Sequence, residues 1–297
     1  MSGKLYIGTS GWYYDDWKPI LFPDGRYRDP LRLLANFFNA AEVNSTYYRP
    51  IDASTSASWA RRLRKVPDFL FTAKLWRRFT HEREEPPTVS EVEQFIDGLA
   101  PVADAGRLGA LLAQFPWSFR YTPENAEWLA NVVDYFRRLA PIVVEVRHDS
   151  WLKPEALQTL RDLQVGFCNI DQPRLGHCIP PTEIATSPVG YIRLHGRNAE
   201  KWFKHEEVHE RYDYLYSRDE LKEWVPRIES VREKTDKTFV FFNNHYRAKS
   251  MANALELKSL LSGEKQPVPD GLVREYPQLR DIVASPPSAS ETQQRLF

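Results

Sequence analysis

The chain has 297 residues, and its 40 lysines and arginines balance its 40 aspartates and glutamates. This balance excludes a strong overall attraction to nucleic acid or to anionic membranes, so any such attraction must come from a local patch. The sequence begins without a signal-peptide pattern, and no window of about eighteen residues is uninterruptedly apolar, so we expect a cytoplasmic protein with no membrane partner. The two cysteines, Cys168 and Cys178, are too few for a disulfide framework and are expected to be free thiols.

Short apolar runs alternate with segments of helical period along most of the chain. The expected strands cover 5–9, 41–45, 68–75, 108–115, the start of 141–151, 165–170, 190–195 and 238–243. The expected helices cover 30–38, 53–65, 89–103, a segment that begins near 123, 154–163, 218–233 and 248–261. A Pro-rich segment with poor helical character follows the sixth strand.

Eight units in which a strand precedes a longer segment predict a closed (β/α)8 TIM barrel, an α/β fold with a single domain over residues 1–262. Residues 263–297 hold several Pro, Ser and Gln and little periodicity, and we expect a short irregular C-terminal tail that is draped on the surface or disordered. The competing fold is an open doubly wound sheet. It normally has a Gly-rich phosphate loop after its first strand, and Gly8-Thr-Ser-Gly-Trp12 is not such a loop.

The fifth strand carries two full charges, Glu145 and Arg147, which lie two residues apart and therefore on one face. Because an unpaired buried charge costs several kcal/mol or more, we expect this strand to end at a polar site. In a TIM barrel the working site lies at the C-terminal ends of the strands. Polar residues follow every expected strand: Ser10, Glu42 with Asn44, Lys74, Gln114, Glu145 with Arg147, Asn169 with Asp171, Arg193 with His195, and Asn243 with Asn244 and His245. Salt bridges that merely close the top of the barrel are the alternative interpretation.

The loops after the strands are rich in aromatic and basic residues. Aromatic faces beside cationic groups suit a ligand that is cyclic, polar and anionic, although loop packing explains any single aromatic equally well. The aromatic set includes Trp12, Tyr14, Trp17, Tyr47, Tyr48, Trp76, Trp117, Trp151, Trp202 and Tyr246, and the basic set is Arg77, Arg78, Arg197, Lys201, Lys204, Arg247 and Lys249.

Two patterns raise the question of a metal. His205-Glu-Glu-Val-His209 fits the H-E-x-x-H zinc motif, but it lies in a polar loop without an apolar stripe, so we interpret it as a chance match. A divalent metal at the mouth is possible from a scattered set, but no spacing enforces one, so the cofactor stays unknown. That set comprises His81, Glu42, Glu145, His148, Asp171, His195 and His245.

Several motifs together resemble one known family, the YecE-like proteins, which are domain of unknown function number seventy-two. They are Gly8-Thr-Ser-Gly-Trp12, Glu42-Val-Asn-Ser-Thr-Tyr-Tyr48, Phe71-Thr-Ala-Lys74, Gln114-Phe-Pro116, Glu145-Val-Arg-His-Asp-Ser-Trp151, Tyr191-Ile-Arg-Leu-His-Gly196 and Phe242-Asn-Asn244. The resemblance covers residues 4–262 and implies a TIM-type barrel. It implies no activity, because the family has none assigned.

We interpret the chain as an enzyme that acts at the barrel mouth on a polar, phosphorylated or sugar-like substrate, with hydrolysis as the favoured reaction. Glu145 or Glu42 would be general acid or base, and His195 or His81 would relay a proton, with Asp171 a further candidate. A Schiff base at Lys74 is conceivable, but a phosphate-binding or ion-paired lysine is favoured. The expected substrate-binding residues are Lys74, Arg147, Arg193, Asn44, Gln114, Asn243, Asn244, Trp12, Tyr14, Trp17 and Tyr48.

Two other chemistries remain open. Glycoside hydrolysis needs two carboxylates, and Glu42 with Glu145 are the available pair, but they come from strands far apart around the barrel. The alternative from another class is a protein without catalytic activity that binds nucleic acid or a nucleotide through the aromatic and basic loops. Its affinity should then fall steeply as salt rises.

Overall fold

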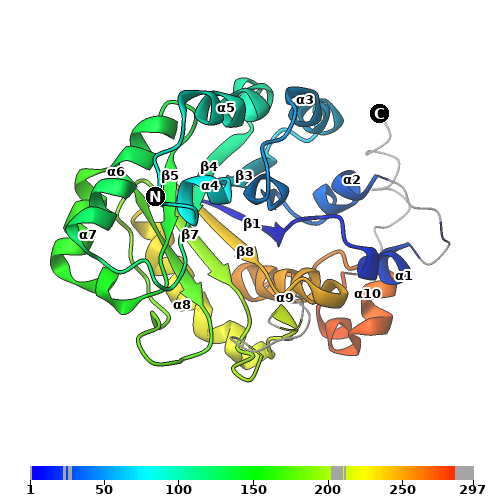
Figure 1. Ribbon diagram of the computed structural model, residues 1–297. Coiled ribbons are helices and arrows are strands. Elements are labelled where there is room, and N and C mark those ends of the chain that lie inside the picture. Colours follow the sequence, from blue (N-terminus) through cyan, green and yellow to red (C-terminus); the bar gives the residue numbers. More distant parts are fainter. Residues whose placement is uncertain (1, 23–24, 26–28, 202–209, 211, 285–297) are drawn as a thin grey trace.

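The computed structural model describes residues 2–22, 25, 29–201, 210 and 212–284. Eight parallel strands pair in chain order and close into a barrel, because β1 pairs with both β2 and β8 (Figure 1). Most positions in these strands are buried, as expected of parallel strands covered on both faces. The strands are β1 Lys4–Ser10, β2 Ala40–Val43, β3 Leu70–Lys74, β4 Leu108–Gln114, β5 Ile142–Glu145, β6 Gly166–Asp171, β7 Val189–Leu194 and β8 Lys237–Phe242.

Helices surround the strands and cover the outer face of the barrel (Figure 1). Several of them begin with a recognisable capping motif. The Thr88 and Ser217 side chains form capping boxes, and Pro30 follows the capping carboxylate of Asp29. The helices are α1 Lys18–Leu21, α2 Pro30–Ala35, α3 Ala53–Arg62, α4 Arg77–Thr80, α5 Val89–Asp104, α6 Pro123–Phe136, α7 Pro154–Asp162, α8 Arg218–Glu233, α9 Lys249–Ser262 and α10 Asp270–Glu275.

Short 3-10 turns follow several strands and shape the mouth of the barrel. They are η1 Asp15–Trp17, η2 Ser45–Tyr47, η3 Asp149–Leu152 and η5 Tyr246–Ala248, whereas a further 3-10 turn, η6 Pro277–Ile282, follows α10. The link between β6 and β7, residues 172–188, is described throughout and contains no helix, as its proline content predicts. In the part of the chain that the structure describes, no helix is both long and apolar enough to cross a bilayer.

The first part of the expected C-terminal tail is more regular than its weak periodicity predicts. Residues 263–284 include α10 and η6, and Leu272 and Ile282 are buried. α10 contacts α1, and the approach is so close that a Cβ atom at Gly271 would lie 1.7 Å from the carbonyl oxygen of Ile20. Figure 1 shows α10 beside α1, so the two ends of the described chain pack together.

Candidate functional site

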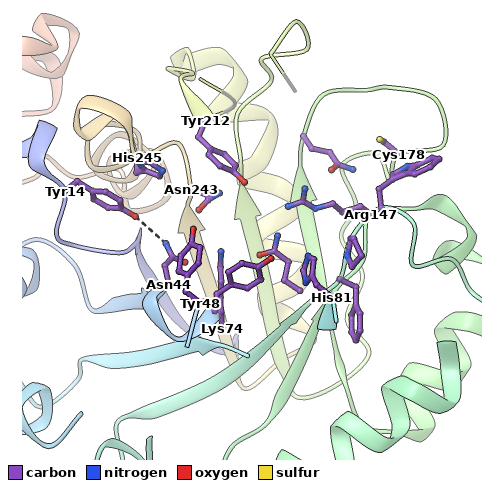
Figure 2. Close-up of a pocket in the computed structure, with 16 residues that line it drawn as sticks. Tyr14, Asn44, Tyr48, Lys74, His81, Arg147, Cys178, Tyr212, Asn243 and His245 are labelled. Atoms are coloured by element: carbon purple, nitrogen blue, oxygen red, sulfur yellow. Dashed lines mark hydrogen bonds between the residues drawn. The ribbon is translucent and has the colours of Figure 1, made fainter. Parts of the chain in front are cut away.

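A cavity of about 420 Å³ opens among the loops that follow the strands, and we call it the mouth pocket (Figure 2). Parallel strands all point their C-terminal ends the same way, so their final side chains converge there. The mouth pocket is lined by Tyr14, Asn44, Tyr47, Tyr48, Lys74, His81, Gln114, Phe115, Pro116, Trp117, Arg147, Gln172, Cys178, Tyr212, Asn243 and His245.

Beneath the mouth pocket lies a fully buried ionic cluster, which we call the charged layer: Glu42, Glu145 and Arg193. The Arg193 guanidinium donates to Glu145 Oε2 at 2.5 Å and to Glu42 Oε1 at 2.7 Å. Two hydroxyls also donate to Glu42, from Ser10 at 2.6 Å and from Tyr191 at 2.7 Å. Such charge-assisted hydrogen bonds make the burial of full charges tolerable.

Both carboxylates of the charged layer are held in the ionised form. Burial alone would raise the pKa of Glu42, but Arg193 and then Lys74 outweigh it and leave the pKa below the ordinary value. Burial likewise opposes the ionised form of Glu145, and Arg193, His195 and Arg147 together hold the pKa of this carboxyl well below its usual range. Neither group is therefore a proton donor near neutral pH.

Lys74, the last residue of β3, reaches the floor of the mouth pocket with an 11% exposed side chain. Its Nζ lies 4.0 Å from Glu42 Oε1, which is longer than a hydrogen bond. Burial, and after it the positive charge of Arg193, lowers the pKa of Lys74 to about 8. Of the groups with shifted pKa values that line the pocket, Lys74 titrates near the working range of an acid–base catalyst.

Arg147 places a second cation at the mouth pocket (Figure 2). Its guanidinium donates to Glu145 Oε1 at 3.0 Å. Although burial disfavours its charged form, Glu145 raises the pKa of Arg147 above the ordinary arginine value. Arg147 is therefore a permanent positive charge, whereas Lys74 is a titrating one.

Two histidines near these charges are neutral. His195 is fully buried, with Nε2 3.2 Å from Glu145 Oε1 and Nδ1 3.2 Å from Asn243 Nδ2. Burial lowers the pKa of His195 to about 4 despite Glu145. His81 lines the mouth pocket, and burial followed by the charge of Arg147 lowers its pKa to about 4 as well.

The predicted site residues divide into three groups by position. Eight line the mouth pocket: Tyr14, Asn44, Tyr48, Lys74, His81, Gln114, Arg147 and Asn243. Four lie fully buried and are not among the pocket-lining residues: Glu42, Glu145, Arg193 and His195. Four lie elsewhere: Asp171, Asn244, Trp12 and Trp17.

The prediction that the Asp171 side chain faces the site at the barrel mouth is wrong. Its carboxylate accepts from Trp224 Nε1 at 2.5 Å and from Arg197 Nη2 at 2.8 Å, and Trp224 belongs to α8 outside the barrel. The physical reason is strand alternation. Asn169, two residues earlier and on the same face, also points away from the interior and binds the carbonyl of Ile184 in the following loop.

Three other predicted binding residues are structural. Trp17 is 2% exposed and donates to the carbonyl of His245 at 2.6 Å. Trp12 packs edge-on against Trp59 at 5.4 Å between ring centroids. Asn244 is fully buried and donates to the Asn253 side chain at 2.9 Å. These residues hold the loops in place and do not line the mouth pocket.

The structure adds Gln172, Cys178 and Tyr212 to the pocket lining, and sequence reasoning missed all three. Gln172 directly follows β6, so its position after a strand was an available signal. Cys178 reaches the mouth pocket because an antiparallel bridge joins it to His148. Tyr212 lies shortly before α8, and no local sequence signal indicates its place in the pocket lining.

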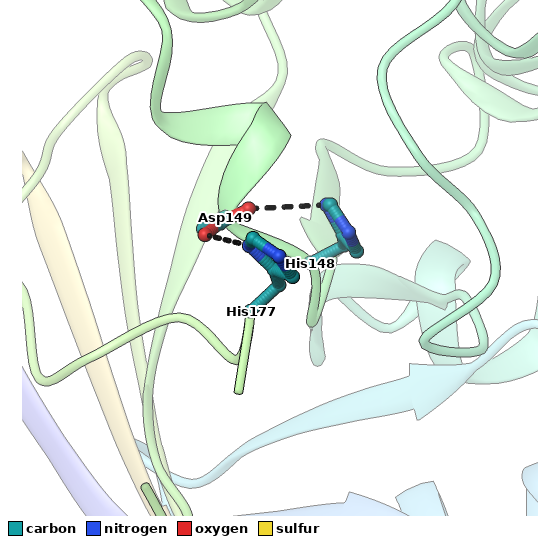
Figure 3. Close-up of side chains that lie close together, drawn as sticks. All are labelled: His148, Asp149 and His177. Atoms are coloured by element: carbon teal, nitrogen blue, oxygen red, sulfur yellow. Dashed lines mark hydrogen bonds and ion pairs between the residues drawn. The ribbon is translucent and has the colours of Figure 1, made fainter. Parts of the chain in front are cut away.

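Outside the mouth pocket, Asp149 lies between two histidines in the loops after β5 and β6 (Figure 3). Its carboxylate oxygens are 3.3 Å from His148 Nδ1 and 2.9 Å from His177 Nδ1, and the three possible ligand atoms lie within 4.8 Å of one another. Nitrogen and oxygen ligands of this kind suit a divalent ion such as zinc. However, His148 Nδ1 already accepts from the Ser150 amide at 3.1 Å, so local hydrogen bonding explains the arrangement.

Of the scattered set proposed for a metal, the structure places only His148 in a three-residue group of possible ligands among the described residues. Asp149 and His177 were not in that set. The His205–His209 motif lies outside the described residues.

Comparison with known proteins places these features in a wider group. The chain matches the family described as protein of unknown function DUF72 over residues 6–278. UPF0759 protein YunF of Bacillus subtilis (strain 168) is 28% identical over 276 residues, which cover 88% of this chain and 95% of that protein. The crystal structure of a DUF72 family protein from Thermotoga maritima MSB8 is 35% identical and has a TM-score of 0.74, over 87% of this chain and 99% of that chain. A DUF72 family protein from Enterococcus faecalis V583 is 23% identical with a TM-score of 0.75, over 87% of this chain and 95% of that chain.

Proposed function

Because the chain belongs to the DUF72 family of proteins of unknown function, we propose a function from its own site: an enzyme that performs acid–base chemistry on a small anionic substrate in the mouth pocket. The substrate is phosphorylated or sugar-like, and hydrolysis is the reaction to test first. One observation carries the proposal. Lys74 and Arg147 line the pocket, whereas no carboxylate is among its described lining residues. A cavity with cations alone favours a bound phosphate or carboxylate.

Hydroxyl groups on the substrate have partners available as well. The side-chain oxygens of Asn44 and Gln172 are buried and have no hydrogen-bond partner among the described residues. Both residues line the mouth pocket. A buried acceptor without a donor is costly, and a substrate hydroxyl is the donor that each lacks. Anion-binding cations beside such acceptors support a sugar-like phosphate.

The proposed roles differ from the simplest carboxylate mechanism. Lys74 serves as the acid–base group because its pKa is lowered to about 8, and neutral His81 accepts or relays a proton. Glu145 holds Arg147 in position from the charged layer, and Arg193 pairs with both Glu145 and Glu42 beneath it. A glycosidase pair needs one protonated carboxyl group at the substrate, so the two buried and ionised carboxylates do not support that mechanism.

The proposal is tested by ligand binding and by turnover. Binding of inorganic phosphate and of a panel of sugar phosphates is measured by calorimetry, and phosphate release from the panel is measured in parallel. Lys74→Met should lower kcat by about 10²-fold or more if the lysine transfers a proton, and Arg147→Met should weaken phosphate binding. Lys4→Met is the control, because Lys4 forms an exposed pair with Asp68 at the opposite end of the strands. Phosphate affinity that is unchanged in both pocket variants would contradict the proposal.

The binding of nucleic acid or of a nucleotide is the other candidate. Two of its expected stacking residues, Trp12 and Trp17, are packed inside the loops. Tyr48, which is 67% exposed, and Trp117 remain for stacking on a base. These remaining aromatic side chains suit a single nucleotide as the small anionic substrate better than a nucleic-acid strand.

A further inference from the structure

The side-chain amine of Lys74 lies at the mouth pocket and is not held by a hydrogen bond to any described residue. Among the described residues that line the pocket, it is the only lysine. Its Nζ makes no hydrogen bond to a described residue, and Glu42 Oε1 at 4.0 Å is the one described carboxylate within that distance. A buried lysine whose role was purely structural would be held by closer contacts. The side chain instead ends at the cavity, as Figure 2 shows.

The surroundings of Lys74 also favour the neutral amine, which is the nucleophilic form. Burial and the neighbouring Arg193 lower the pKa of Lys74 to about 8. About a tenth of the molecules then carry a neutral amine at pH 7, compared with roughly one in a few thousand for an ordinary lysine. Desolvation beside another cation is a recognised way to activate a lysine. By contrast, burial raises the pKa of the Cys178 thiol, which makes it a poor competitor as nucleophile.

We propose that Lys74 attacks the carbonyl carbon of a small anionic ketone or aldehyde, whose anionic group binds Arg147, and forms an iminium link to it. Arg147 follows shortly after the end of β5 and Lys74 is the last residue of β3, and both line one cavity of about 420 Å³. This inference rests on the proposed anion site and narrows its substrate to compounds that also carry a carbonyl group.

The step is balanced without an oxidant or reductant. The Nζ lone pair forms the new N–C bond while the carbonyl π electrons move to oxygen, and a proton passes from nitrogen to that oxygen. The carbinolamine then loses water as solvent supplies one further proton and the C–O bond breaks. The resulting iminium withdraws electrons from the adjacent carbon, and water later reverses the link to release product.

Reductive trapping tests the inference with the full chain. The protein is incubated at pH 8 with pyruvate or with dihydroxyacetone phosphate, and sodium borohydride then reduces any iminium to a stable secondary amine. Intact mass measures stoichiometry, and peptide mapping locates the adduct. The two compounds distinguish a carboxylate from a phosphate as the anionic group. We expect about one adduct per chain, located on Lys74, with at least one of them.

Two matched lysine variants show whether the trapped adduct forms on Lys74. Lys74→Arg keeps the positive charge but has no amine, so specific trapping should fall by about tenfold or more, whereas Lys4→Arg should leave it unchanged. Trapping that survives in Lys74→Arg, or no adduct with either compound, would overturn the inference. If neither compound gave an adduct but inorganic phosphate still bound through Lys74 and Arg147, the proposed function would stand. If phosphate affinity were independent of both residues, the proposed function would be contradicted as well.

Discussion

Lys74 should give two opposite pH dependences, because its charged form binds anions and its neutral form attacks carbonyl groups. Its pKa is lowered to about 8, so phosphate affinity should fall as the pH rises from 7 to 9. Over the same range the rate of reductive trapping should rise and then level off. Calorimetry and intact mass measure the two trends. Trapping that keeps rising toward pH 10.5, as for an ordinary lysine, would show that Lys74 is not activated.

Arg193 should be critical for stability, because it neutralises both carboxylates of the charged layer. Arg193→Met leaves Glu42 and Glu145 buried with fewer partners, and the free energy of unfolding should fall by about 3–5 kcal/mol. Denaturant unfolding measures this. Lys4→Met removes only an exposed pair and should change stability much less, because solvent screens such pairs. Equal effects of the two substitutions would contradict the ionic interpretation of the charged layer.

His195 should make the protein sensitive to mild acid. The groups facing it are Glu145, Arg193 and Arg147, and its folded pKa is lowered to about 4. Between pH 6.5 and 4 the unfolded chain therefore binds a proton that the folded chain does not, so stability is lost as the pH falls. This single group should account for about 2 kcal/mol between pH 7 and 5.

A pair of variants tests this sensitivity. His195→Gln should reduce the difference in unfolding free energy between pH 7 and 5, whatever it does to stability at pH 7. His177→Gln is the matched control, because the His177 side chain is 71% exposed. If both variants kept the wild-type difference, the acid sensitivity would have to come from other groups.

At the scale of single residues, the sequence predicts which polar groups meet but not how deep they lie. Strand alternation correctly puts Glu145 and Arg147 on one face, and they contact each other at 3.0 Å. Depth depends on side-chain length and on what lies above. The Arg193 side chain is long enough to bind the carboxylates of both Glu42 and Glu145 and holds them beneath the mouth pocket. No local sequence pattern indicates this depth.

At the scale of elements, eight strands and the main helices follow from hydrophobic period and helix start signals, with ends that differ by a few residues. The predicted helix 218–233 coincides with α8, whose start is fixed by a capping box. The predicted helix 30–38 ends earlier, at Ala35, because the Phe38 side chain packs into the core just before β2 begins. Such helix ends are set by tertiary packing, and a local sequence pattern carries no information about tertiary packing.

The position of Asp171 shows how a strand can be predicted while the direction of its final side chain is not. The carboxylate joins β6 to α8 through Trp224 and Arg197. Asp171→Asn should therefore lower the free energy of unfolding by about 1–3 kcal/mol and leave phosphate binding unchanged. Thermal unfolding and calorimetry measure the two effects. Weakened phosphate binding in a folded variant would return Asp171 to the site.

At the scale of the whole molecule, the balanced charge predicts a weak response to salt. With two cations in the pocket and no net charge, phosphate affinity should fall by less than about tenfold between 50 and 200 mM salt. A nucleic-acid groove that neutralises many phosphates would lose about 10³-fold or more over this range. Titration of a single-stranded oligonucleotide at both salt concentrations separates the two cases. A steep loss would restore the nucleic-acid alternative.

The contact between α10 and α1 joins segments that a ribosome makes far apart in time. β1 also pairs with β8, so β1 gains its second partner only after β2 to β7 have been made. At typical elongation rates the time between the synthesis of β1 and that of β8 is roughly 12 to 45 seconds. During this time the unpaired edge of β1 can pair with another nascent chain. Production of this protein in cells should therefore depend on chaperones that shield β1 until β8 has emerged from the ribosome.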